Sequence, residues 1–301
     1  MGLGGLGQAW SAAGRTYPLL APFGELLVVF AAMLWVLLAA SYIVKWASAP
    51  AVARAEWMHP VQCAFVAGIP ASLLLLLPAL APRLGMTGFP LFLLLACCQV
   101  VVTAAIFARW ISGRPEPATV TPAWHLGAVA GHFFVAGAAA ALGHKLTGWC
   151  FFGTGMAMWI IIDSVVLHRL ATHETLAPLL RPLIANEITP PAVALIVYIG
   201  LGGGGEADAI ALGLFGWALF LAVALVIIWR WLCEAPFGPG YWAYTLPAAA
   251  LSVAAWQIAH ATATEPARYF ALALFVAANA LIGFIAVRTV AALAQGRFVP
   301  R

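Results

Sequence analysis

Ten apolar segments follow one another along this chain, and most reach the roughly 20 residues that a helix needs to cross a bilayer. Only 8% of the 301 residues are charged, against about 25% in soluble domains. So few polar groups cannot cover a soluble surface. We therefore predict an all-α membrane protein with ten transmembrane helices. The segments are Met1–Gly14, Pro22–Ile43, Pro60–Ala81, Thr87–Ile111, Pro122–Gly143, Gly148–Val166, Pro190–Gly202, Ala209–Leu232, Tyr241–Ala261 and Pro266–Leu293.

The first segment, Met1–Gly14, is shorter than the others and rich in glycine. We expect the chain to start downstream of the true beginning of this helix. Residues 1–301 are then a single ten-helix transmembrane domain whose first helix is truncated at its N-terminal end.

Lysine and arginine residues are distributed unevenly between the two sides of the membrane. Cytoplasmic loops carry the excess of these residues, and the excess lies on the side reached after even-numbered segments. We therefore predict a multi-pass protein of a bacterial-type inner (plasma) membrane with both termini in the cytoplasm. That side carries Lys45, Arg54, Arg109, Arg114, Arg169, Arg181, Arg230, Arg288, Arg297 and Arg301, and the other side carries Arg15, Arg83, Lys145 and Arg268.

Prolines recur in the odd-numbered segments. Three of these segments open at Pro60, Pro122 and Pro190, and the ninth carries Pro247 internally. This repeat predicts five helical hairpins. Odd segments are also richer in small residues, which let backbones approach closely, whereas the bulky side chains of even segments suit lipid. We therefore predict an inner ring of five odd helices around a central pore.

The ninth segment points to a gate. Pro247 removes a backbone hydrogen bond and opens the helix. In a membrane, such a break is tolerated where protein or a water-filled cavity surrounds it. Leu246, just before the break, is therefore predicted to point into the pore.

Two ionisable residues within the apolar segments are candidates for proton or ion coupling, because intramembrane charges are functional by default. These are Asp163 and His132, although a packing role is favoured for His132.

The long loop Leu167–Thr189 is interpreted as a solvated connector. Its alternative is an anion-attracting vestibule formed by Arg169 and Arg181.

Other patterns indicate packing rather than chemistry. Residues 2–7 match GxGxxG, but no strand precedes them, so small-residue helix packing is favoured over phosphate binding. The five cysteines form no CxxC pair and are interpreted as buried small hydrophobic residues. No catalytic or metal-ligating cluster stands out. We expect no enzymatic activity, no cofactor, no metal and no nucleic-acid partner.

The predicted inner helices lack charge through their cores. A pore lined in this way suits weakly hydrated anions, drawn by cationic entrances and backbone N–H dipoles. The expected partners are therefore small inorganic or organic anions, together with the lipid bilayer.

Several stretches of the chain, taken in order, resemble the TehA/SLAC1 family of tellurite-resistance proteins, C4-dicarboxylate transporters and slow anion channels. They are Met58–Phe65, Thr121–Trp124, Phe151–Met156, Arg181–Val193 and Tyr241–Pro247. The resemblance implies a quasi-fivefold arrangement of five hairpins, a homotrimer with one pore in each protomer, and passive anion conduction.

On this resemblance, Leu246 is the pore gate, and the residues that shape the inner ring are Phe65, Gly131, Pro191 and Pro247. The family usually has phenylalanine at the position of Leu246, and often proline at the position of Leu126-Gly127. We expect a gated anion channel or passive anion transporter. The alternative is a proton-coupled exporter of C4-dicarboxylate, sulfite or tellurite-related anions.

Overall fold

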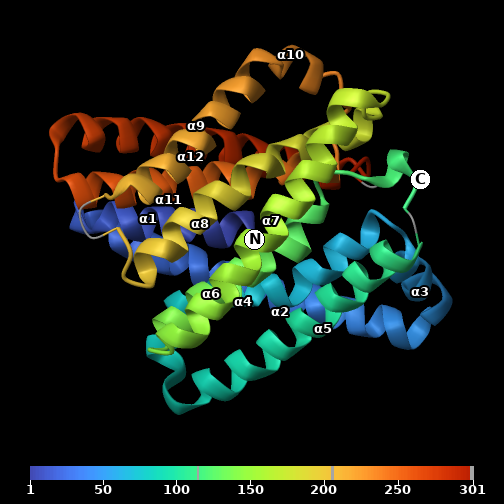
Figure 1. Ribbon diagram of the computed structural model, residues 1–301, viewed down its shortest axis with the longest axis horizontal. Coiled ribbons are helices and arrows are strands. Elements are labelled where there is room, and N and C mark those ends of the chain that lie inside the picture. The colour runs from blue at the N-terminus through green and yellow to red at the C-terminus, as the bar shows by residue number, and fades with distance from the viewer. Residues whose placement is uncertain (114, 205–206, 299–301) are drawn as a thin grey trace. The chain divides into compact units, whose positions relative to one another are not determined.

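The chain folds into helices, and no strand occurs in the described residues. A computed structural model describes residues 1–113, 115–204 and 207–298. The helices form two compact units (Figure 1). We call Met1–Glu25 with Thr175–Arg301 the terminal unit, and Leu26–Glu174 the central unit.

The terminal unit is built around one helix, α11, which packs against α1, α8 and α12. Helix α8 also packs against α9, and η5 against η6. Trp10 of α1 donates a 2.8 Å hydrogen bond to Asn279 of α12, which ties the two ends of the chain together. The elements are α1 (Gly2–Gly14), η1 (Pro18–Leu20), η5 (Pro178–Ile188), α8 (Thr189–Gly200), α9 (Ala209–Ile227), α10 (Trp229–Leu232), η6 (Pro239–Tyr244), α11 (Thr245–Thr262) and α12 (Glu265–Ala294).

The central unit packs α4 against both α5 and α6, and α6 against α7. His59 caps the start of α4, because its Nδ1 accepts from the backbone N–H groups of Val61 and Gln62 at 3.1 and 3.2 Å. The elements are α2 (Ala21–Ser48, which begins in the terminal unit), α3 (Pro50–Met58), α4 (Gln62–Leu84), η2 (Gly85–Thr87), α5 (Gly88–Gly113), η3 (Pro117–Thr119), η4 (His125–Ala130), α6 (Gly131–Ala141) and α7 (Lys145–Thr172).

Each of the ten predicted segments contains a helix of the structure. In the described residues, six helical stretches are long and apolar enough to cross a membrane: Pro18–Ser48, Gln62–Gly113, Lys145–Thr172, Pro178–Gly200, Ala209–Ile227 and Glu265–Ala294. The stretch Gln62–Gly113 holds two helices, α4 and α5. A multi-pass membrane protein follows from these stretches, and the ten-span arrangement stays a prediction.

The predicted difference between odd and even segments is visible in burial. Helices α2, α9 and α12 expose large apolar side chains along their lengths, whereas α6, α8 and α11 are largely buried. The interpretation of the cysteines was wrong for four of five. Cys63 is buried, and the other four are exposed on the chain surface.

The prolines singled out in the seventh and ninth segments lie in the first turns of helices, whereas α4 carries Pro70, Pro78 and Pro82 internally. Pro190 and Pro191 lie in the first turn of α8, which the segment η5 precedes. Pro247 lies in the first turn of α11, directly after η6. The prediction that Pro247 is internal to a helix was therefore wrong. The first N–H groups of a helix have no intrahelical acceptor, so a proline there removes no hydrogen bond.

Candidate functional site

The glycines of α1 allow the start of α11 to approach closely. A β-carbon on Gly2 would lie 2.0 Å from the hydroxyl oxygen of Thr245, and one on Gly5 would lie 3.0 Å from the β-carbon of Ala249. The first distance leaves no room for a β-carbon, and the second is a tight contact. The GxGxxG stretch is thus a helix-packing face, as predicted.

Leu246 lies at this contact. It is buried, and its Cδ1 would be 3.5 Å from a β-carbon at Gly5 of α1. Its backbone stands at the junction of the 3₁₀ segment η6 and helix α11. Leu246 of α11 therefore packs against α1, and both helices are predicted to belong to the inner ring. Its role as a gate stays a prediction.

The central unit carries a second irregular backbone, the π-helix η4, at His125–Ala130. It occupies the position where the family often has proline, so the helix is irregular here without one. Gln99 of α5 is fully buried, and its Nε2 donates to the carbonyl oxygen of Gly127 at 2.9 Å. A buried amide therefore supports the carbonyl of this segment.

Gly127 and Gly131 each permit a close helix contact. A β-carbon on Gly127 would lie 2.4 Å from the β-carbon of Ala67 in α4, and one on Gly131 would lie 2.1 Å from Nε2 of Gln99 in α5. Both contacts agree with the close packing predicted for the small residues of the odd segments, and the two glycines meet two different helices. That Gly131 also lines a pore stays a prediction.

Asp163 and His125 form an ion-pair contact within the central unit. Asp163 Oδ1 of α7 lies 3.4 Å from His125 Nε2 of η4, and the His125 side chain is fully buried. His125 Nδ1 lies 3.3 Å from the carbonyl oxygen of Pro122. Sequence reasoning selected Asp163 but missed His125. The only signal was its position just after the Thr121–Trp124 stretch.

His132 is buried, and its Nδ1 lies 2.7 Å from the carbonyl oxygen of Ala128. A carbonyl only accepts, so Nδ1 carries the hydrogen. This bond agrees with the favoured packing role, and both roles of His132 stay predictions.

Arg169 and Arg181 are buried and engaged with the protein. Arg169 Nε donates to the carbonyl oxygen of Pro117 at 3.2 Å. Arg181 pairs with Glu234, donates to the carbonyl oxygen of Leu176 at 3.1 Å, and stacks on the Trp231 ring. Residues 181–188 are buried throughout. The interpretation of the loop Leu167–Thr189 as a solvated connector was wrong for residues 181–188, whereas most of residues 171–180 are exposed. The cost of burying these charges favours a structural role over a vestibule.

Two further predicted wall residues differ in exposure. Pro191 is buried in the first turn of α8, and Phe65 of α4 is 46% exposed on the chain surface. The terminal unit supplies Leu246, Pro191 and Pro247, and the central unit supplies Phe65 and Gly131.

Comparison with known proteins decides the family. Residues 1–290 match the family SLAC1, described as voltage-dependent anion channel. The chain belongs to this family. Membership agrees with the resemblance carried by the five sequence stretches.

Relatives of the chain come from bacteria and plants. A tellurite resistance protein TehA homolog of Haemophilus influenzae is 28% identical over 299 residues, which cover 99% of this chain and 90% of that protein. The S-type anion channel SLAH3 of Arabidopsis thaliana is 25% identical over 79% of this chain and 37% of its own length. The guard cell S-type anion channel SLAC1 of the same plant is 28% identical over 61% of this chain and 33% of its own length.

Proposed function

We propose that the protein is a gated anion channel or passive anion transporter that conducts small anions through a central pore. The observation that carries the proposal is the family match across residues 1–290. The names of the relatives, which include S-type anion channels, agree with it.

We also propose five helical hairpins in a quasi-fivefold arrangement around this pore. Helix order within each unit supports this arrangement. In the terminal unit α8 packs on α11 and α11 on α1, and in the central unit α4 packs on η4 and α6. These are the neighbours that a ring of the odd segments requires. The walls would then include Phe65, Gly131, Pro191 and Pro247.

The proposed gate is Leu246, at the junction of η6 and α11. An apolar side chain at a narrow point closes a pore by excluding water. Its burial against α1 would hold it in one position, whereas an alanine would leave that point wider.

The test is anion flux into liposomes that contain the purified protein. We expect Leu246→Ala to raise chloride or nitrate flux severalfold, and Leu246→Phe to lower it. Leu195→Ala is the matched control, because Leu195 of α8 is fully buried in the same unit but lies outside the proposed gate. Flux equal to wild type in both Leu246 variants would remove this residue from the gate.

A proton-coupled exporter of C4-dicarboxylate, sulfite or tellurite-related anions is the second candidate. The contact of Asp163 with His125 favours it, because it brings a carboxylate to an imidazole between two helices. Coupled export requires saturable flux that follows a pH gradient and falls in Asp163→Asn. Linear flux without such a gradient is the result expected for a channel.

We further propose that the protein is a homotrimer in a bacterial-type inner membrane, with both termini in the cytoplasm. The excess of lysine and arginine after even segments supports this orientation.

A further inference from the structure

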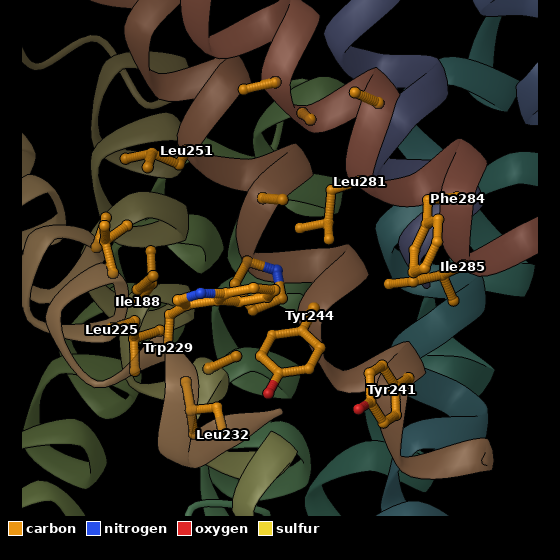
Figure 2. A pocket seen from close by; sticks show the side chains of 18 of the residues that line it. Ile188, Leu225, Trp229, Leu232, Tyr241, Tyr244, Leu251, Leu281, Phe284 and Ile285 are labelled. Atoms are coloured by element: carbon orange, nitrogen blue, oxygen red, sulfur yellow. The ribbon is translucent and has the colours of Figure 1, made fainter. Parts of the chain in front are cut away.

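The terminal unit contains a cleft of about 800 Å³, and of the residues proposed for the pore wall Pro247 also lines it. Its walls come from α9, α10, the η6–α11 junction and α12, and nearly all are apolar (Figure 2). The α12 wall runs from Leu274 to Arg288, which is about 21 Å at 1.5 Å per residue. Half of a bilayer with its headgroups is also roughly 20–22 Å thick. The cleft therefore has the length of one leaflet.

One end of this cleft is polar. Arg288 lies there, with its guanidinium 5.0 Å from the ring of Phe237 and 5.8 Å from the ring of Phe284. Trp242 donates a 3.0 Å hydrogen bond to Thr289, which fixes η6 beside this turn of α12. Arg288 forms no ion pair with any described residue.

The hydroxyl of Tyr244 is a second donor in the cleft. Figure 2 shows the Tyr244 ring among the apolar side chains of the cleft. Within the described residues, its hydroxyl has no hydrogen-bond partner. By contrast, Tyr241 nearby donates to the carbonyl oxygen of Ala235 at 2.7 Å. The cleft thus offers a cation and a hydroxyl that have no acceptor among the described residues, within largely apolar walls.

We propose that this cleft binds an anionic phospholipid from the bilayer. The acyl chain lies along the apolar walls, and the phosphate accepts from Arg288 and Tyr244. Trp229 and Tyr241 also line the cleft, and tryptophan and tyrosine concentrate at the headgroup level of membranes.

A lipid fits the cleft better than a helix of a second copy. A transmembrane helix offers mainly apolar side chains, and its own backbone hydrogen bonds leave no acceptor for Arg288 and Tyr244. A phosphate carries both the negative charge and the oxygens that these two groups require.

The first experiment is native mass spectrometry of the purified full chain with phosphatidylglycerol or phosphatidylcholine. We expect wild type to retain phosphatidylglycerol preferentially, by about fivefold for one arginine near an anionic headgroup. Arg288→Gln should abolish the preference, and Tyr244→Phe should weaken it. Arg230→Gln is the matched control, because Arg230 is an exposed cation of α10 that does not line the cleft. A preference unchanged in Arg288→Gln overturns the proposal.

The second experiment fills the cleft without changing charge. Ala277→Trp places a large ring in the α12 wall, whereas Ala273→Trp places it at an exposed position of α12 outside the cleft. We expect only Ala277→Trp to lower retention of phosphatidylglycerol, with the mass of the assembly unchanged. If Ala277→Trp instead changes the oligomeric state and leaves lipid retention intact, a second copy occupies the cleft and the proposal fails.

Discussion

The contact between Gly127 and Ala67 allows a quantitative test of packing in the central unit. A β-carbon on Gly127 would lie 2.4 Å from the β-carbon of Ala67, far inside the roughly 3.5–4.0 Å of a favourable carbon contact. Neither methyl group has a rotamer that relieves this overlap. Gly127→Ala must therefore separate η4 from α4.

The expected free energies of unfolding follow from two opposing effects. Overpacking costs about 3 kcal/mol at the upper end of its range, and alanine gains about 1 kcal/mol over glycine in a helix, so Gly127→Ala should cost about 2 kcal/mol. Ala67→Gly alone should cost about 1 kcal/mol for the same helix preference. In the double variant the overlap is absent, since the next atoms are 3.3 and 3.7 Å away. The gain from alanine at position 127 then cancels the loss from glycine at position 67, and the free energy of unfolding of the double variant should be close to that of wild type.

The assay is equilibrium unfolding in mixed detergent micelles, from which the coupling energy of the double-mutant cycle follows. We expect a coupling of about 3 kcal/mol. Gly153→Ala in α7 is the control, because no atom lies within 4 Å of its β-carbon position. The reasoning is refuted if Gly127→Ala is as mild as Gly153→Ala, or if the costs of the two single variants simply add.

Two further predictions concern the terminal unit. The N-cap carboxylate of Asp208 accepts from Ala211 N at 2.9 Å and from the Tyr198 hydroxyl at 2.6 Å. These two hydrogen bonds hold the pKa of the Asp208 carboxyl below its usual value, and the bond from the Ala211 backbone has the larger effect. The ionised Asp208 carboxylate therefore stabilises the fold at neutral pH, and this contribution is lost as the pH falls through the lowered pKa. Asp208→Asn should accordingly lower the melting temperature at pH 7, and the decrease should be smaller in acid. Asn279→Leu removes the acceptor of the Trp10 hydrogen bond, and we expect it to lower the free energy of unfolding by about 1 kcal/mol. In the background of Trp10→Phe, which has no donor to lose, the same substitution should lower it much less.

Much of the fold could be predicted from hydropathy and side-chain size. Apolar segments separated by polar residues gave the positions of the ten main helices, because burial in lipid leaves the backbone few alternatives to a helix. The contrast between α6 and α2 could be predicted in the same way. Small residues mark close packing, and bulky ones mark a surface that faces lipid.

The irregular segments could not be predicted, because distant residues stabilise them. The π-helix η4 is supported by the amide of Gln99, which lies 28 residues away from Gly127. Residues 181–188 of η5 are buried although they include Arg181, because Glu234 and backbone carbonyls engage that charge. The contact of His125 with Asp163 likewise requires the packing of α7 on η4.

The π-helix at His125–Ala130 changes the spacing along its own helix. With hydrogen bonds from i to i+5, it holds more residues in each turn than an α-helix. The side chains before η4 and those after it are therefore out of phase along one helix, while Gly127 within η4 meets α4 and Gly131 at the start of α6 meets α5. A substitution scan along residues 122–141 should then give two helical periodicities out of phase with each other, with the phase change located at η4.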